Sequence, residues 1–77
     1  MSPDNLRAIG GALFGPRWQR ELARALSISE RLMRMWLAGD RRLPANLVDR
    51  LDVITINRIT ELVAIRRELQ RWSRKAA

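Results

Sequence analysis

Apolar residues recur at helical spacing in the first part of the chain. Positions i, i+3, i+7 and i+8 of one helical face carry Leu6, Ile9, Leu13 and Phe14. The preceding Ser2 and Pro3 are typical of a helix start, because they supply an N-cap and a proline at the first helical position. Gly15 and Pro16 predict the end of this first helix and a turn.

Two shorter helical patterns follow between residues 17 and 39. The first covers about residues 17–26 and places three apolar residues on one face: Leu22, Ala23 and Leu26. The second covers about residues 30–38 and has a matching apolar face: Met33, Trp36 and Leu37. Two helices joined by so short a turn form a helix-turn-helix, a unit that can present its second helix to a DNA groove.

Individual residues predict where these two helices begin and end. Ser27 predicts the end of the first of these helices, and Ile28 predicts an apolar side chain that packs in the turn. Ser29 predicts the N-cap of the following helix, since a serine hydroxyl accepts a hydrogen bond from an otherwise unpaired backbone N–H. Gly39 predicts the C-terminal end of that helix. We expect Trp18 to pack in the core against a neighbouring helix, and glycines at 10 and 11 to allow a close approach.

The remainder of the chain is predicted to be helical with one interruption. Pro44 is expected to start a fourth helix whose inner face carries Leu47, Val48 and Leu51. Residues 53–56 are four successive β-branched residues, which favour a strand or a helix break; we expect a kink or tight turn. Residues 57–72 then predict a C-terminal helix. Residues 1–77 are therefore expected to form a single all-α domain, a small bundle of four or five helices.

The C-terminal helix has an apolar stripe that is too wide for solvent. It is interrupted by Arg66 and comprises Ile59, Leu62, Val63, Ile65, Leu69 and Trp72. We expect part of it to complete the core and the rest to meet a second subunit. A coiled coil is disfavoured, because only about two heptads are available and Arg66 would lie between the helices. The predicted dimer interface is Ile56, Ile59, Leu62, Val63, Leu69 and Trp72.

Composition narrows the class of partner. The net charge is +7 and the isoelectric point about 11.7, with fourteen arginines and one lysine. This surplus points to nucleic acid, an anionic membrane or an acidic partner, although a coding bias would also enrich arginine. The basic amphipathic membrane helix is disfavoured, because Glu61 and Glu68 lie on the polar side of the last helix.

Chemistry that needs histidine or cysteine is excluded, since the chain contains neither. The carboxylate pairs Asp49 with Asp52 and Glu61 with Glu68 are interpreted as solvated helix-face charges. We therefore expect no enzyme, no catalytic residues, no metal site and no cofactor. Without an amino-terminal leader or a membrane-spanning run, the chain is expected to be a cytosolic protein.

The helix at residues 30–38 carries the most specific functional signal. At about 100° per residue, Arg31, Arg34, Met35 and Ala38 lie opposite its apolar face. Arginine reads guanine edges, and an apolar side chain can meet a thymine methyl group. The alternative is a solvated face with one stray methionine. Gln19, at a helix start, and Arg41 and Arg42, which follow one another in the connector after residue 39, are candidates for contact with the DNA backbone. The alternative is that these are ordinary solvated polar and charged side chains.

Residues Trp18–Pro44 resemble the phage-repressor-like (Cro/XRE-type) helix-turn-helix family. Ala23 matches the small residue at the helix crossing, Ile28 the buried residue after the turn, and the other matches are Met33, Trp36, Gly39 and Pro44. The resemblance implies a lambda-repressor-like bundle that binds double-stranded DNA as a dimer on a two-fold operator. Two departures are Ser27, where relatives usually have glycine, and Met35, where they often carry a polar side chain.

The resemblance also implies roles for particular residues. Base readout would fall to Ser29, Glu30, Arg31, Arg34, Met35 and Ala38. Phosphate contacts would come from Arg17, Gln19, Arg20, Arg41 and Arg42. Glu30 is ambiguous, because it could accept from a cytosine amine or instead cap its helix and orient Arg34.

The sequence thus predicts a sequence-specific transcription regulator, a dimeric repressor of a palindromic operator. We expect a cytoplasmic, nucleoid-associated protein encoded by a bacterium or phage, with double-stranded DNA and a second copy as partners and no small-molecule effector. Two alternatives remain open. One is a DNA-binding antitoxin or interaction module whose last helix binds a partner protein, and the other is a DNA-bending excision or architectural factor.

Overall fold

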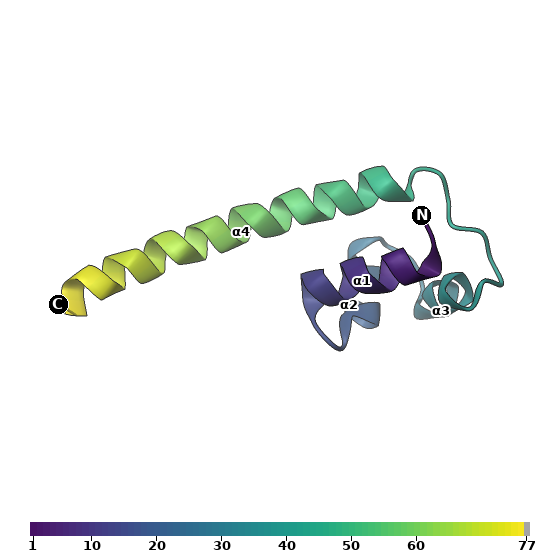
Figure 1. Cartoon of the computed structure of the whole chain (residues 1–77), viewed down its shortest axis with the longest axis horizontal. Helices are drawn as coiled ribbons and strands as arrows, with labels where there is room; N and C mark the ends of the chain where they lie inside the picture. Colours follow the sequence, from purple (N-terminus) through teal and green to yellow (C-terminus); the bar gives the residue numbers. More distant parts are fainter. Residues whose placement is uncertain (77) are drawn as a thin grey trace.

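The computed structural model describes residues 1–76, with side-chain burial through residue 74. In that part of the chain all regular structure is helical, and four helices follow one another: α1 (Pro3–Phe14), α2 (Trp18–Ala25), α3 (Glu30–Ala38) and α4 (Leu47–Ala76). Helices α1 to α3 and the start of α4 pack into a small head, from which the rest of α4 projects (Figure 1). The prediction of an all-α fold with four or five helices is confirmed, with four.

The head begins with the predicted helix start. The Ser2 hydroxyl accepts a hydrogen bond from the Asn5 backbone N–H at 3.2 Å, and the Asn5 side-chain oxygen accepts one from the Ser2 N–H at 2.8 Å. This reciprocal pair is a capping box that satisfies two unpaired donors at the start of α1. At its other end, Gly15 adopts a φ of 81°, a left-handed region that glycine enters at little cost.

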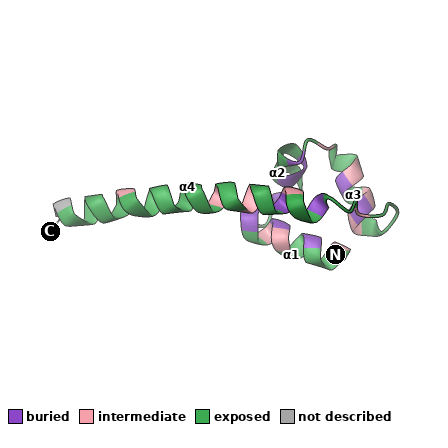
Figure 2. Cartoon of the chain, turned by 90° about the horizontal axis from the view of Figure 1, so that it is seen from above, coloured by how far each residue is buried: buried purple, intermediate pink, exposed green. Residues whose placement is uncertain are grey.

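One cluster of apolar side chains forms the core of the head. The faces that the sequence predicted for α1 to α3 contribute most of it, and the cluster comprises Leu6, Trp18, Leu22, Ala23, Leu26, Met33, Trp36, Leu47 and Leu51. Trp18 is 8% exposed, which confirms its predicted core position. The start of α4 therefore closes the head that α1 to α3 begin (Figure 2).

Two arginine side chains link neighbouring helices of the head by hydrogen bonds to backbone carbonyl groups. The Arg7 side chain donates to the backbone oxygen of Leu37 at 2.9 Å and forms an ion pair with Asp4 at 2.7 Å. The Arg50 side chain donates to the backbone oxygen of Leu26. Leu37 and Leu26 lie at the carboxyl ends of α3 and α2, where carbonyl groups lack partners within the helix. These two arginines therefore hold α3 to α1 and α4 to α2.

Helix α4 differs from its prediction in three ways. Pro44 precedes the helix by one turn instead of starting it, and the Leu47 N–H donates to the Pro44 oxygen at 3.1 Å. The expected kink at residues 53–56 is wrong, because the helix runs through them without a break. Thr55 and Thr60 each donate a side-chain hydrogen bond to the carbonyl four residues earlier, so their polar groups are satisfied within the helix. The low helix propensity of β-branched residues is thus too small to interrupt it.

The third difference concerns which residues face the core. Leu47 and Leu51 are buried as predicted, but Val48 is 55% exposed, because one residue along a helix turns the side chain by about 100°. Ile54 is the last α4 residue that packs on the core cluster. The expectation that residues 57–72 also complete the core is wrong for the single chain, since the apolar side chains of this segment remain exposed (Figure 2).

Within residues 1–76, none of the four helices combines the length and apolar character needed to cross a membrane.

The contact between α1 and α2 depends on a missing side chain. A Cβ atom built on Gly10 would lie 2.1 Å from Cε3 of the Trp18 ring, whereas one on Gly11 would meet nothing within 4 Å. The predicted close approach is therefore confirmed at Gly10 and does not occur at Gly11. Trp18 packs flat on the backbone of α1 at this point, and that contact fixes the distance between the two helices.

We expect Gly10→Ala to destabilise the protein by about 1–3 kcal/mol, because the added methyl group forces Trp18 out of its position. Gly11→Ala is the matched control and should stabilise it by up to about 1 kcal/mol, since alanine is the better helix former. Urea unfolding followed by circular dichroism measures both. Equal effects of the two substitutions would contradict the close packing of Trp18 on Gly10.

Candidate nucleic-acid interface

A tight turn sets the position of α3 relative to α2. Ser27 has a φ of 57°, a left-handed conformation that residues other than glycine seldom adopt. The Ser27 and Ile28 N–H groups donate to the oxygens of Arg24 and Ala23 at 3.1 and 2.9 Å. Ile28 packs against the core as predicted, and the Ser29 hydroxyl caps α3 by accepting from the Leu32 N–H at 3.0 Å.

Helix α3 has one buried and one exposed face. Met33 and Trp36 are 0% and 4% exposed, and the half-buried Leu37 packs beside them. Arg31, Arg34 and Ala38 are exposed, as predicted. Met35 was expected to lie open among them but is half-buried. The exposed face is therefore more basic and less apolar than the sequence suggested.

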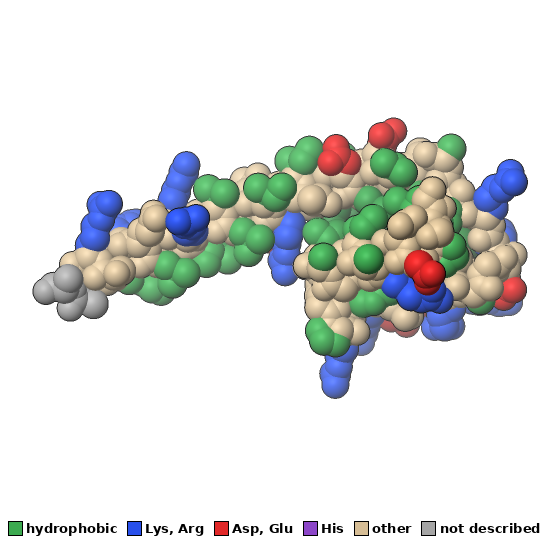
Figure 3. Space-filling view, in the orientation of Figure 1, with side chains coloured by type: hydrophobic (Ala, Val, Ile, Leu, Met, Phe, Trp, Pro, Cys, Tyr) green, Lys and Arg blue, Asp and Glu red, His purple; other side chains and the backbone are tan. Residues whose placement is uncertain are grey.

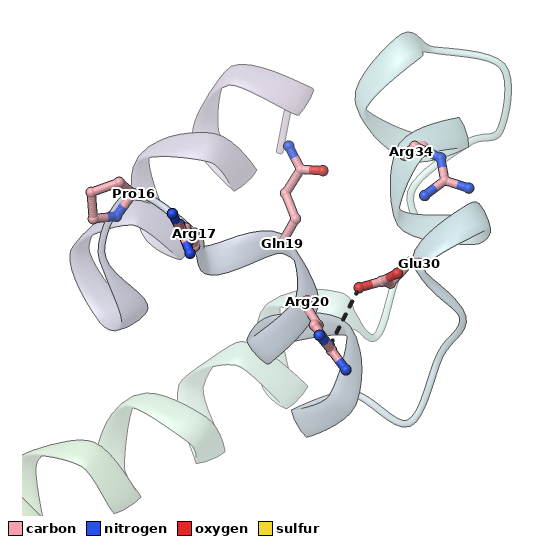
Figure 4. A pocket seen from close by; sticks show the side chains of 6 residues that line it. All are labelled: Pro16, Arg17, Gln19, Arg20, Glu30 and Arg34. Atoms are coloured by element: carbon pink, nitrogen blue, oxygen red, sulfur yellow. Dashed lines mark ion pairs between the residues drawn. The ribbon is translucent and has the colours of Figure 1, made fainter.

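A shallow hollow of about 260 Å³ lies between the start of α2 and the first turns of α3 (Figure 4). Its lining consists of Pro16, Arg17, Gln19, Arg20, Glu30 and Arg34. Three of the five predicted phosphate residues and two of the six predicted base-reading residues thus come together in one place. The lining comes from α2, from the two residues before it and from α3, and the turn at residues 26–29 brings α2 and α3 side by side.

An ion pair crosses this hollow. The Arg20 Nε lies 3.9 Å from the Glu30 Oε1, and Figure 4 shows the two side chains pointing toward one another. Glu30 does not orient Arg34, because its ion pair is with Arg20 on α2. Both side chains are more than half exposed, so the pair adds less than about 1 kcal/mol to stability. An anion entering the hollow would compete with Glu30 for Arg20.

The remaining predicted phosphate residues lie beyond the other end of α3. Gly39 ends α3 in the left-handed conformation with a φ of 81°, and Arg41 and Arg42 follow it, both exposed. They line a second hollow together with Trp36 and Leu43. Because α3 has nine residues and is about 13 Å long, it separates the two groups of cations by roughly that distance. Arginines therefore flank α3 at both ends.

The arrangement suits recognition of anions rather than covalent chemistry. Exposed guanidinium groups bind phosphate oxygens in pairs, and the N–H groups at the start of α2 add positive potential. The Ser29 oxygen already accepts the capping bond, which leaves its proton available to an outside acceptor. Among the described residues, no group of three or more acidic side chains is placed to hold a metal ion.

Some residues of the site were not singled out by sequence. Pro16 lines the first hollow, and the only signal for it was its position at a predicted turn. Arg7 and Arg50 were part of the basic surplus, but their hydrogen bonds to carbonyl groups give them structural roles. All six predicted dimer-interface residues lie on α4 beyond the head and are 44–59% exposed: Ile56, Ile59, Leu62, Val63, Leu69 and Trp72.

Comparison with protein-family models, with curated proteins and with solved structures gives no match to this chain. The geometry described above is therefore the basis for the functional argument.

The left-handed backbone at Ser27 gives a test of the turn. Ser27→Val should destabilise the protein by about 1–2 kcal/mol, because a β-branched side chain clashes in this conformation. Ser27→Gly should be neutral or slightly stabilising, since glycine enters the conformation without that clash. Thermal unfolding of the two variants measures the difference. A valine variant as stable as the glycine variant would contradict the observed turn.

Proposed function

We propose that the protein is a sequence-specific regulator of transcription that binds double-stranded DNA through a lambda-repressor-like helix-turn-helix formed by α2 and α3. The observation that carries this proposal is the exposed face of α3, which presents Arg31 and Arg34 while Met33 and Trp36 hold the opposite face in the core. A helix anchored on one face and basic on the other suits insertion into a groove.

The dimensions of α3 fit the DNA major groove. An α-helix with its side chains is about 10–12 Å across, and the groove is about 12 Å wide. In this arrangement Arg31 and Arg34 reach base edges, and Ala38 lets the helix approach closely. Ser29 and Glu30 lie at the start of the helix, where residues of a recognition helix contact bases. The half-buried Met35 contributes at most the exposed part of its side chain, as an apolar contact to a thymine methyl group.

Cations at both ends of α3 support binding to the DNA backbone. Arg17, Gln19 and Arg20 flank its first turn, and Arg41 and Arg42 follow its last. Phosphates on the two sides of a groove would thus meet basic or amide groups on either side of the reading helix. The net charge of +7 strengthens this attraction and makes it dependent on salt.

We further propose that the regulator acts as a dimeric repressor on a palindromic operator. A head as small as this contacts few base pairs, so a second head is the usual way to obtain an adequate site. Binding over a promoter would exclude competing proteins without any additional activity. A cytoplasmic location follows from this role.

The exposed apolar residues of α4 favour one alternative. An interaction module, such as a DNA-binding antitoxin, would use them to bind a different protein. A DNA-bending architectural factor is the other alternative, and it would bind random and selected DNA equally well.

Selection of bound sites from random double-stranded DNA tests the proposal directly. We expect enrichment of a palindrome whose half-sites are about one helical turn, or a multiple of it, apart. Recovery of random sequence with unchanged affinity would support the architectural alternative, and failure to retain any DNA would reject the proposed function.

Arg34→Ala should weaken binding to the selected operator by about 1–3 kcal/mol and relax base preference at one position of each half-site. The matched control is Arg67→Ala, which removes the same charge from an exposed position on α4. Fluorescence anisotropy at physiological salt compares the two. If Arg34→Ala binds as tightly as the control, Arg34 does not read a base.

Arg42→Ala should behave differently, because a phosphate contact carries no sequence information. Affinity should fall by a similar factor for operator and random DNA, and the slope of log K against log salt should flatten by about 1. A titration series between low and physiological salt measures that slope. An unchanged slope would remove Arg42 from the set of phosphate contacts.

A further inference from the structure

The face of α4 that closes the head continues far beyond it. At about 100° per residue, Leu62, Ile65, Leu69 and Trp72 fall within an arc of roughly 80°. That arc is the same one that carries Leu47, Leu51 and Ile54, which pack on the core. The four outer residues are instead 54–59% exposed. Figure 3 shows hydrophobic surface continuing along α4 away from the head.

Beyond Ile54, the exposed apolar residues of α4 form two faces rather than one broad stripe. Ile56, Ile59 and Val63 lie more than about 60° away from the arc just described, and Arg66 points between the two groups. Arg66 therefore does not interrupt the face of Leu62, Ile65, Leu69 and Trp72, which we call the outer face. Ile65 belongs to this face although the sequence did not assign it to an interface.

We propose that a second copy of this chain covers the outer face, with the two α4 helices antiparallel. The spacing of its residues is three, four and three, which reads the same in both directions. In antiparallel register, Leu62 packs against the partner's Trp72, and Ile65 against the partner's Leu69. Such pairing of first with fourth heptad positions is what an antiparallel helix pair requires. The two-fold axis then passes at the level of Arg67.

The head itself excludes the parallel arrangement. A parallel partner helix on the outer face would continue alongside residues 47–54, where α1, α2 and α3 already occupy the same face of α4. Arg58, stacked 5.5 Å from the centre of the Phe14 ring, marks where the head ends on α4. Antiparallel pairing over residues 62–72 stays clear of this region, because each head lies at the opposite end of the helix pair.

The size of the outer face is consistent with a dimer that associates weakly. Monomeric proteins rarely leave contiguous apolar patches larger than a few hundred Å² in contact with water, and a tryptophan alone can bury about 150–250 Å². A pair of helices of this length buries less than the roughly 1,600 Å² of a standard interface, so association should depend on concentration. At the edges of the helix pair, Arg66 lies near the partner's Arg66, and Glu68 lies near the partner's Glu68. Salt screens the repulsion between these like charges and should therefore strengthen the dimer.

The pairing also bears on the operator, a consequence that rests on the proposed function. With the axis at Arg67, Ile54 of one chain and the partner's Ile54 are separated by roughly 26 helical residues, or about 39 Å. Half-sites of a palindromic operator lie about 34–36 Å, or a multiple of this distance, apart. Ile54 is the α4 core residue nearest to the axis, and α3 lies at the far end of the head (Figure 1), so the two α3 helices are farther apart than one turn of DNA. We therefore expect the antiparallel dimer to read half-sites that are separated by a multiple of one helical turn.

Measuring the mass of the full chain in solution tests whether a second copy covers the outer face. Sedimentation equilibrium without DNA should show a reversible dimer for the parent chain and a monomer for Leu69→Glu. Val63→Glu is the matched control, because it places the same charge on the other apolar face, and it should remain dimeric. Circular dichroism verifies that both variants are folded. A monomeric parent at all concentrations, or a monomeric Val63→Glu beside a dimeric Leu69→Glu, would overturn the proposal.

Cross-linking tests the orientation, and the absence of cysteine from the sequence makes single-cysteine variants clean probes. Antiparallel pairing brings Arg66 close to the partner's Arg66, so Arg66→Cys should link to itself through a short bismaleimide. Parallel pairing would instead bring Arg66 close to the partner's Glu61. Linking only in a mixture of Arg66→Cys with Glu61→Cys would reject the antiparallel dimer. None of these measurements contains DNA, so an intact dimer that fails to bind DNA would reject the proposed function alone.

Discussion

Burial of one face of α3 is the constraint on which the rest of the structure depends. Met33 and Trp36 take part in the single core cluster, so the arginines on the opposite side of the same short helix must face outward. The position of that face is fixed from both ends, by the left-handed turn at Ser27 and by the hydrogen bond from Arg7 to Leu37. Packing of Trp18 on Gly10 then sets the distance between the two helices that support α3.

The arginines divide into groups with different physical roles. The Arg7 and Arg50 side chains donate hydrogen bonds to carbonyl groups at helix ends and thereby help to hold the head together. Among the described residues, the arginines around α3 form no such hydrogen bond to a carbonyl group, and Arg20 forms an exposed ion pair with Glu30. The proposed function uses these exposed guanidinium groups in two ways, since phosphates would position the helix and base edges would select the sequence.

Helix α4 uses one face for two purposes. Its first turns complete the core of the head, and the same arc of side chains then extends away from the head as the outer face. Because the face is continuous, the head blocks one end of it and thereby limits how a second helix can lie there. The fold of one chain would in this way determine the geometry of a pair of chains, and with it the spacing of two reading helices.

The sequence by itself determined α1 to α3, the caps of α1 and α3 and the burial of Trp18, because these depend on contacts between residues close in the chain. Only the tertiary structure decided where the core ends on α4, that Val48 and the apolar residues from Ile56 onward stay exposed, and that Glu30 pairs with Arg20 on another helix. Periodicity identifies an apolar face but not what covers it. The β-branched run at 53–56 stayed helical because packing of Leu51 and Ile54 outweighs a small local preference.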